Sequence, residues 1–362
     1  MTKKSIVWIT ADYFVDVDKA LVPYLRDKMG LNIKWYVFCG HDSKVEMPEG
    51  IIDRVFRMKN RNRSPKCFME YCSIFREMGV DKADLIYSDA VSIPFYYPAL
   101  FHVCKRRTPI VHGAHNVIPY PVWPASLKWY VRYIFRFNSH FQLFSKFTAQ
   151  YFKEHYPKKS MFYAPMTVKD FGPVTTDNYS LDATKVNLLF FGNVVTNKRL
   201  DLLIDAIKGL PSNIQERIHL NICGKCNEAD RYLKQIDGCK AISTYFKRID
   251  DCEIAELFTK NQFFMLPYQD VAQSGPHMIA YNYNLPVIAT DIEGFAERVE
   301  DGKNGFLFHR NDVESLRQAI IKAASLSNEE YSQLKANLAK YTAENFSVEV
   351  VAKKYVEYFN SI

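Results

Sequence analysis

A long apolar run is missing from this sequence of 362 residues. No stretch of 18 consecutive apolar residues occurs, so we expect no transmembrane helix. The first residues, MTKKSIVWITADYF, contain only a short apolar run before Asp12 and no small-residue cleavage site. We interpret them as a first β-strand and not as a signal peptide.

The cysteine pairs that a metal or redox site needs are also missing. The motif CGKC at 223–226 has the CxxC spacing of zinc knuckles and redox sites, but Cys239 and Cys252 stand alone and form no second close pair. We therefore favour reduced thiols in a cytoplasmic protein over metal or redox chemistry.

Positive charge is unevenly distributed along the chain. The net charge is +7, and residues 1–180 hold 26 Lys and Arg against 16 Asp and Glu, whereas residues 181–362 hold 21 against 24. The first half is therefore expected to meet an anionic partner: a lipid surface, a phosphorylated acceptor or nucleic acid. Because no zinc-finger or aromatic RNA-binding motif occurs, we expect no nucleic acid partner.

Strand-like apolar runs alternate with helical patterns from end to end. Apolar residues recur at three- and four-residue spacing, for example at 198–210 and 312–326. The alternation predicts an α/β fold with doubly wound parallel sheets. The strand-like runs lie at 5–10, 33–39, 83–89, 108–113, 187–192, 218–224, 263–268 and 286–290.

Two domains are expected, because the chain exceeds the usual size of a single core. We place an N-terminal Rossmann-like domain at 1–165 and a C-terminal one at 186–340. The segment 166–185, rich in Pro, Gly, Thr and Asp, is the predicted linker, and 341–362 is predicted to be a helix that returns to the first domain. Ligands of such sheets bind beyond the carboxyl ends of the strands, so we expect the site in a cleft that both domains face.

The segment NLLFFGNVVTNKRLDLLIDAIKGL (187–210) has the pattern of a phosphate-binding turn. Gly192 lets the backbone approach a ligand, and Lys198 and Arg199 precede a helix whose free N–H groups carry partial positive charge. A solvated Lys-Arg pair beside an ordinary turn fits the same residues, so both interpretations stay open.

A second such turn lies in DVAQSGPHMIAYNYNLPVIAT (270–290). Gln273, Ser274 and Gly275 precede Pro276, which suits the first position of a helix, with Ser274 or Gly275 as its cap. Two helix N-termini together with Lys198 predict a diphosphate site that needs no metal.

These segments resemble the C-terminal half of family 4 retaining glycosyltransferases, which have the GT-B fold. The most specific part is PVIATDIEGFAERVEDGKNGFLF (286–308), and DLIYSDA (84–90) and PIVHGAHNV (109–117) resemble the family more weakly. The resemblance implies that a sugar passes, with retention, from a nucleotide-sugar donor to a glycan or lipid-linked acceptor. Surface polysaccharide biosynthesis is the implied process.

The resemblance also implies roles for individual residues. Lys198 matches the lysine that meets the diphosphate, Glu297 matches the acidic residue after the last strand, and His115 matches a histidine that commonly faces the transferred sugar. For His115, a hydrogen-bonded structural histidine is the alternative. The implied catalytic residues are His115 and Lys198, and the implied donor-binding residues are Gly192, Asn193, Lys198, Arg199, Gln273, Ser274, Gly275, Pro276 and Glu297.

No cofactor or metal is expected, because cations and helix termini can hold a diphosphate without one. The triplet DVD at 16–18 has the composition of a metal-binding motif. We interpret it instead as a helix start at which Asp16 or Asp18 is the cap.

Two departures from the family leave alternatives open. Asn193 stands where the family usually has an arginine, and Arg199 is the candidate to replace its charge. Val271 and Ile279 stand where the family often has two glutamates, as in a subset with a Gln-Ser-Gly loop. A nucleotide-sugar epimerase and a non-catalytic nucleotide-sugar-binding partner of another transferase therefore remain alternatives to the transferase.

A basic stripe is predicted on a helix within 123–144. Cations beside aromatic residues suit a membrane interface, so we expect peripheral attachment to an anionic surface on the inner face of the cell membrane. The alternative is that the aromatic residues fill the core and the arginines form a solvated face. The cations are Lys128, Arg132 and Arg136, and the aromatic residues are Trp129, Tyr133 and Phe137.

Overall fold

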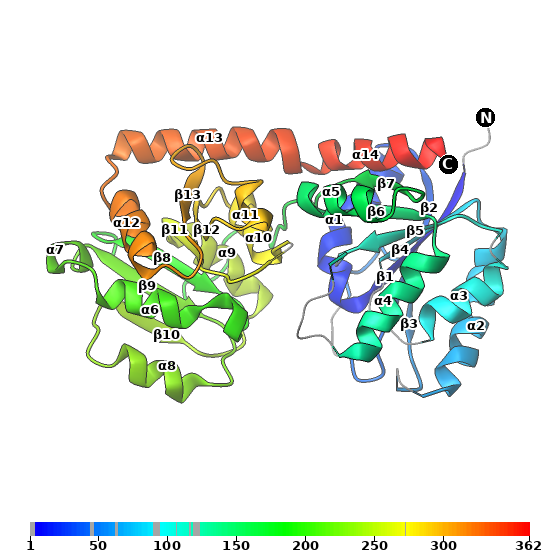
Figure 1. The fold of residues 1–362 in the computed structure, drawn as a ribbon, viewed down its shortest axis with the longest axis horizontal. Helices are drawn as coiled ribbons and strands as arrows, with labels where there is room; N and C mark the ends of the chain where they lie inside the picture. Colours follow the sequence, from blue (N-terminus) through cyan, green and yellow to red (C-terminus); the bar gives the residue numbers. More distant parts are fainter. Residues whose placement is uncertain are drawn as a thin grey trace. The chain divides into compact units, whose positions relative to one another are not determined.

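The computed structural model describes residues 4–43, 47–61, 64–89, 95–105, 107–115, 117–118, 124–271 and 273–362. From the segments quoted above, residues 1–3, Ala90, Asn116, Trp123 and Ala272 lie outside these ranges. The chain forms two compact units: unit 1 comprises Met1–Thr167 with Phe346–Ile362, and unit 2 comprises Val168–Asn345. Each unit is a parallel β-sheet with helices on both faces (Figure 1), which confirms the predicted fold class.

The sheet of unit 1 has seven strands among the described residues, in the order β3-β2-β1-β4-β5-β6-β7. Trp8 of β1 pairs with Trp35 of β2 and with Tyr87 of β4, and all three side chains are buried. Apolar residues on both faces are typical of central parallel strands. The strands are β1 (Ser5–Ala11), β2 (Asn32–Cys39), β3 (Arg54–Arg57), β4 (Leu85–Asp89), β5 (Ile110–Ala114), β6 (His140–Leu143) and β7 (Ser160–Tyr163).

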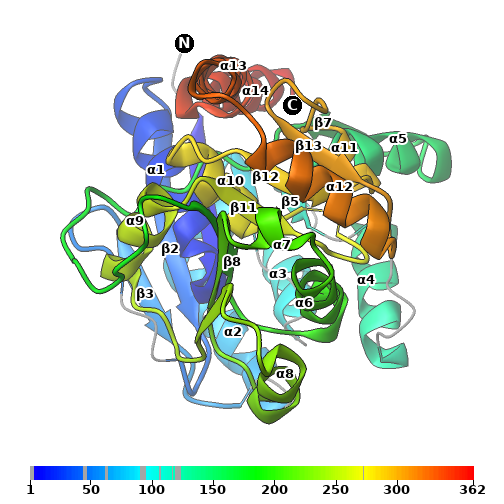
Figure 2. The same cartoon turned by 90° about the vertical axis from the view of Figure 1, so that its left-hand side faces the viewer.

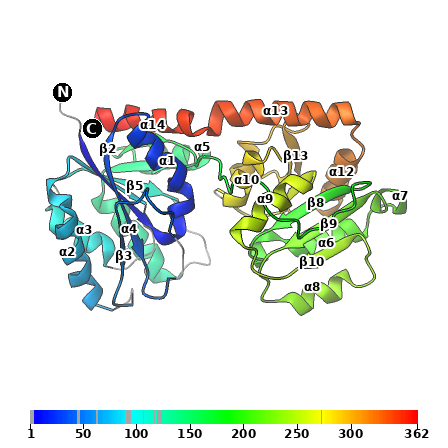
Figure 3. The ribbon, with the colours of Figure 1, turned by 180° about the vertical axis from the view of Figure 1, so that it is seen from behind.

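Helices cover both faces of this sheet. On one face, the last helix of the chain packs against α1 and β7 (Figure 3). Its Tyr355 side chain is buried with those of Trp8 and Leu21. On the other face, a second core contains Tyr71 of α2, Leu100 of α3 and residues of α4 and α5. The helices are α1 (Val15–Asp27), α2 (Lys66–Met78), α3 (Tyr96–Cys104), α4 (Ala125–Phe137), α5 (Lys146–His155) and α14 (Val348–Ser361), with short 3-10 turns at Asp12–Phe14 and Val80–Lys82.

The sheet of unit 2 has six strands among the described residues, in the order β10-β9-β8-β11-β12-β13, and neighbouring strands are parallel. The chain winds outward in one direction from β8 and in the other from β11. The topological switch point therefore lies between β8 and β11, where doubly wound sheets bind their ligands. The strands are β8 (Val186–Phe191), β9 (Ile218–Cys223), β10 (Ile242–Tyr245), β11 (Phe263–Leu266), β12 (Val287–Thr290) and β13 (Gly305–Phe308).

Successive side chains of β8 point alternately toward the two helical layers of unit 2. Leu188 and Phe190 join the core under α6 and α12, whereas the ring of Phe191 packs against Phe258 of α9 on the other face (Figure 2). Within the described ranges, no helix is both long and apolar enough to cross a membrane. The helices are α6 (Leu200–Lys208), α7 (Ser212–Gln215), α8 (Ala229–Ile236), α9 (Asp251–Lys260), α10 (Gly275–Asn282), α11 (Glu293–Ala296), α12 (Val313–Ala324) and α13 (Asn328–Phe346).

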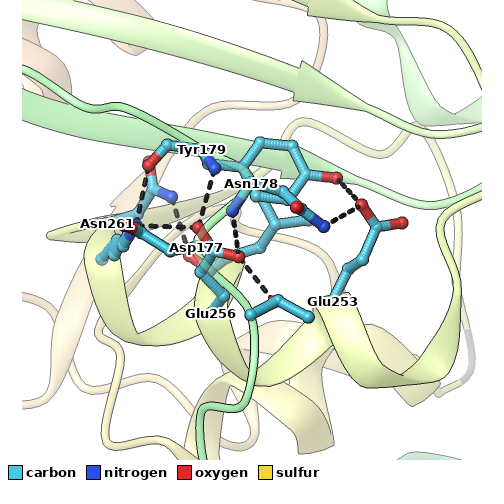
Figure 4. A network of polar contacts seen from close by, with 9 residues as sticks. Asp177, Asn178, Tyr179, Glu253, Glu256 and Asn261 are labelled. Carbon is cyan, nitrogen blue, oxygen red and sulfur yellow. Dashed lines mark hydrogen bonds and ion pairs between the residues drawn. The ribbon is translucent and has the colours of Figure 1, made fainter.

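Part of the predicted linker 166–185 is fixed to α9 by the buried carboxylates of Glu253 and Glu256 (Figure 4). Glu256 accepts hydrogen bonds from the Thr176 hydroxyl (2.6 Å), the backbone N–H groups of Asn178 (2.9 Å) and Tyr179 (2.7 Å), and the Lys260 ammonium (2.7 Å). Burial alone would raise the pKa of Glu256, but these four donors together lower it to about 2. The segment from Val168 onward is therefore an integral part of unit 2.

Candidate functional site

A tight loop follows β8 at the switch point of unit 2. Gly192 has φ +99°, a left-handed conformation that favours glycine, and its N–H donates to Cys223 O at 2.9 Å. A Cβ atom on Gly224 would lie 2.1 Å from Gly192 O. The ends of β8 and β9 thus approach so closely that only glycine fits at position 224, whereas at position 192 the left-handed backbone favours glycine.

Lys198 extends back over this loop. It ends the 3-10 turn Thr196–Lys198, and its ammonium donates to Phe191 O at 3.4 Å. Nζ also lies 2.9 Å from the position of a Cβ on Gly192 and 5.5 Å from the centroid of the Tyr268 ring. The absence of a side chain at Gly192 therefore makes room for the Lys198 ammonium.

The Lys198 ammonium is largely removed from water. Desolvation lowers its pKa from the usual value near 10.5 to about 8. A cation that loses hydration without a close carboxylate raises the free energy of the folded protein, and such groups are frequent at functional sites. This location is therefore suited to an anion.

The loop after β11 supplies a helix N-terminus beside Lys198. Ser274 caps α10, because its hydroxyl accepts a hydrogen bond from the N–H of His277 at 3.3 Å. Pro276 lies within the first turn, and its Cγ is 4.0 Å from the same Cβ position on Gly192 that Lys198 approaches. The predicted Ser274 cap is confirmed, and the two predicted turns meet in space.

Tyr268 lies under this helix terminus. It is 5% exposed, and its hydroxyl has no hydrogen-bond partner among the described residues. Burial raises the pKa of the Tyr268 hydroxyl, and the adjacent Ser274 hydroxyl opposes the rise. An unsatisfied polar group thus lies beside the capping residue of α10.

Lys169 was not predicted as a site residue. It is only 8% exposed, and its Nζ lies 3.0 Å from the position of a Cβ on Gly275, the first residue of α10. In the sequence it belongs to the aperiodic segment interpreted as a linker, and no local pattern marks it. Its approach to α10 is a tertiary contact.

Arg199 makes its contacts away from the Lys198 ammonium. Its guanidinium binds the Asp201 carboxylate at 3.1–3.3 Å and also donates to Asn311 Oδ1. Asn193 is exposed, and Gln273 is half-buried. The donor-binding roles of these three residues stay predictions.

Glu297 follows α11, beyond the end of β12. Its side chain is 10% exposed and lies 3.3 Å from the guanidinium of Arg298, which is itself buried. Glu297 therefore belongs to the same sheet edge as the Ser274 loop, since β11 and β12 are neighbours. Its role toward a donor stays a prediction.

His115 lies in unit 1, at the carboxyl end of β5. Its ring is stacked between the rings of Phe14 and Phe144, with centroid distances of 3.9 Å and 4.1 Å. Its Nε2 lies 2.6 Å from the Asp89 carboxylate. Both residues are buried. This geometry fixes the ring orientation, which suits either of the two interpretations of His115.

The prediction that Asp16 or Asp18 caps a helix was wrong. α1 begins after Phe14, and no side chain caps it. Asp18 is instead buried and accepts hydrogen bonds from Trp8 Nε1 (2.9 Å) and the Thr10 hydroxyl (2.5 Å), and burial holds its pKa well above the usual value. Asp18 thus connects α1 to β1.

The CGKC motif has a packing role. Cys223 ends β9 and is buried, and burial raises the pKa of its thiol. All eight cysteines are free. In the described part of the chain, no group of three His, Cys, Asp or Glu side chains is arranged to hold a metal ion.

Part of this chain is similar in sequence to known glycosyltransferases. The family model described as Glycosyl transferases group 1 matches residues 176–344. The uncharacterized glycosyltransferase MJ1069 of Methanocaldococcus jannaschii is 26% identical over 182 residues, which cover 49% of this chain and 46% of that protein. The match thus spans less than half of that relative.

Two solved structures have a similar fold. A glycosyltransferase from Rickettsia africae has a TM-score of 0.79 at 16% identity, covering 100% of this chain and 99% of that one. HepE of Anabaena, in complex with UDP and glucose, has a TM-score of 0.74 at 16% identity, covering 99% and 100%. Unit 2 therefore contains the segment that matches the group 1 model, and the two units have the Rossmann-like folds of these GT-B structures.

Proposed function

We propose that this protein is a family 4 type retaining glycosyltransferase that moves a sugar from a nucleotide-sugar to a glycan or lipid-linked acceptor in surface polysaccharide biosynthesis. One observation carries the proposal: Lys198 and the first turn of α10 meet at the ends of β8 and β11, inside the segment that matches the group 1 model. A helix N-terminus and a desolvated ammonium together favour a phosphate group. The HepE complex with UDP and glucose supports a nucleotide-sugar as the donor.

The proposed catalysis is electrostatic. When the bond between sugar and diphosphate breaks, negative charge grows on the leaving phosphate. Lys198 and the N–H groups at the start of α10 stabilise that charge more in the transition state than in the ground state. No metal or other cofactor is proposed for this role, because the cation and the helix terminus supply the positive charge.

The other predicted residues complete the proposed donor site. We assign a donor contact to Glu297 after β12 and a contact with the transferred sugar to His115. Gly192 lets the ligand approach the backbone closely. Asn193, Arg199 and Gln273 are proposed to contact the donor at the edge of the site. A second candidate function is a non-catalytic nucleotide-sugar-binding partner. The reason is that Ile279, which stands at one of the two positions where the family often has glutamate, is a buried apolar residue of α10.

Incubation of the protein with nucleotide-sugars and lipid-linked glycan acceptors tests the proposal, in buffer that contains a chelator. We expect release of nucleoside diphosphate together with a product whose new bond keeps the donor's anomeric configuration, as read by NMR. Conversion of the sugar without nucleotide release would indicate an epimerase. Binding without either reaction would indicate the non-catalytic partner.

Binding of a nucleoside diphosphate is expected to weaken about tenfold between pH 7 and pH 9. The reason is that Lys198 has a pKa of about 8 in the unliganded protein, and only its protonated form attracts phosphate. Below pH 8 the Lys198 side chain is mostly charged, and above pH 8 it must take up a proton before it attracts the phosphate. Calorimetry across this range measures the effect.

Lys198→Arg is the control for this pH profile, because arginine keeps its proton throughout the range. Its affinity should be nearly constant between pH 7 and pH 9. Identical slopes for the wild type and Lys198→Arg would assign the titration to another group and contradict the role of Lys198.

We also propose that α4 attaches unit 1 to an anionic membrane surface. Trp129 is 67% exposed and stacks on Tyr133 at 5.9 Å, and Phe137 is 36% exposed. The cations Arg132 and Arg136 are exposed on the same helix, and the Arg136 guanidinium lies 5.8 Å from the Phe137 ring. Exposed aromatic residues beside cations match the composition of an interfacial helix.

Neutralising Lys128, Arg132 and Arg136 with glutamine is expected to reduce flotation with phosphatidylglycerol vesicles by at least about fivefold, because each cation near such a surface contributes about 1 kcal/mol. The matched control replaces Lys28, Lys34 and Lys82, three exposed lysines of unit 1 on other elements. If both triple variants float equally, α4 is not the attachment surface.

A further inference from the structure

The segment that carries Lys169 lies along α10 and is held at several points. Lys169 N donates to Met278 O at 3.2 Å, and Asn282 Nδ2 donates to the Asp170 carboxylate at 3.1 Å. The Tyr283 hydroxyl accepts from Phe171 N at 3.0 Å and donates to Gly172 O at 2.9 Å. The backbone of Lys169 is thereby fixed beside the helix, which preorganises its side chain.

Gly275 provides the space that the Lys169 ammonium occupies. A Cβ at this position would lie 3.0 Å from Nζ and 3.5 Å from Cε of Lys169. The backbone of Gly275 is not left-handed, so its conformation does not require glycine. The glycine is explained instead by close approach of the lysine to the helix start.

Positive charge accumulates around this helix start. The first turn of α10 carries the partial positive charge of its free N–H groups, Lys169 lies against Gly275, and Lys198 lies near Pro276. Positive groups gathered at one helix terminus attract an anionic ligand. The buried Tyr268 hydroxyl, next to the Ser274 hydroxyl, adds a polar group to this helix start.

We propose that Lys169 is a second phosphate ligand, so that Lys169 and Lys198 together select ligands with two adjacent phosphates. The inference rests on the proposed function, because it concerns the donor site of unit 2. Two ammonium groups from separate segments match the two anionic phosphates of a nucleoside diphosphate better than the single phosphate of a monophosphate. Lys169 thereby becomes a determinant of specificity for the donor diphosphate.

The test is calorimetry on the full chain with the diphosphates and monophosphates of uridine, adenosine and guanosine. For the base that binds, Lys169→Met should weaken diphosphate binding about tenfold or more and monophosphate binding less than threefold, since one charge-assisted contact is lost. Gly275→Ala should weaken diphosphate binding in the same direction but less, because its methyl group shifts the ammonium by a few tenths of an ångström without removing the lysine. Lys234→Met, at an exposed position on α8, is the matched control and should bind like the wild type.

The outcomes distinguish a failure of the proposed function from a failure of the proposed role of Lys169. Wild-type protein that binds none of the diphosphates would overturn the proposed function. Wild-type binding that survives unchanged in both Lys169→Met and Gly275→Ala would leave the proposed function standing and overturn the role of Lys169. Circular dichroism confirms that each variant is folded, and recovery of affinity in Lys169→Arg would support a role for its charge.

Discussion

Lys198→Met is expected to weaken binding of a nucleoside diphosphate about 100-fold. The substitution keeps the length and apolar character of the side chain but removes the ammonium that lies over Gly192 and Tyr268. Loss of a partly buried charge-assisted contact typically costs about 2–5 kcal/mol. Calorimetry at pH 7 measures the change, with Lys234→Met as the control, and an affinity within threefold of wild type would contradict the assignment.

The same variant is expected to be more stable than the wild type without ligand, by up to about 3 kcal/mol. Folding lowers the pKa of Lys198 to about 8, so its charged form is disfavoured in the folded state. That cost is fully present below pH 8 and is relieved as the pH rises toward the unfolded value near 10.5. Weaker binding together with higher stability would distinguish a binding role from damage to the fold.

Glu256→Gln is expected to lower the free energy of unfolding by about 3 kcal/mol. One carboxylate oxygen accepts from Thr176 and Asn178, and the other accepts from Tyr179 and Lys260. In either orientation, the amide NH2 of glutamine would face two of these donors. Urea denaturation measures the change.

Glu314→Gln is the control for this substitution, because Glu314 is exposed on α12. Its free energy of unfolding should stay within about 0.5 kcal/mol of wild type. The Glu256 contribution should be fully present above its unfolded pKa and be lost as the pH falls toward about 2. Equal stability of the two variants at neutral pH would show that the carboxylate does not anchor the segment.

The central strands of both sheets could be predicted because their signal is local. β11 is a continuous apolar run, and β8 contains one at 188–191, as expected for strands buried on both faces. β3 and β7 lie at the edges of the sheet of unit 1 and are short, and each has only one fully buried residue. Their sequences show no clear apolar periodicity, because most of their side chains are at least partly exposed to solvent.

The two turns of the proposed phosphate site were also predictable, since a glycine or a capping serine and the following helix lie close together in the sequence. What the sequence could not supply was the partner of each charged group. Arg199 and Lys198 are adjacent, yet Arg199 binds Asp201, and only Lys198 extends back over Gly192. The carboxylate two residues later is a signal that would have favoured this pairing.

Lys169 shows the limit of a local pattern. Its position depends on how the segment after Val168 lies along α10, and the hydrogen bonds that fix it join residues more than a hundred positions apart. The His115–Asp89 contact likewise joins the ends of two neighbouring strands. Such contacts follow from sheet order, which apolar periodicity alone does not determine.

A crystal structure of the protein with a bound nucleoside diphosphate is the decisive measurement. The proposal predicts phosphate oxygens about 3 Å from Lys198 Nζ and from the N–H groups at the start of α10, beyond the ends of β8 and β11. A nucleotide whose phosphates contact neither Lys198 nor the first turn of α10 would contradict the assignment of this site.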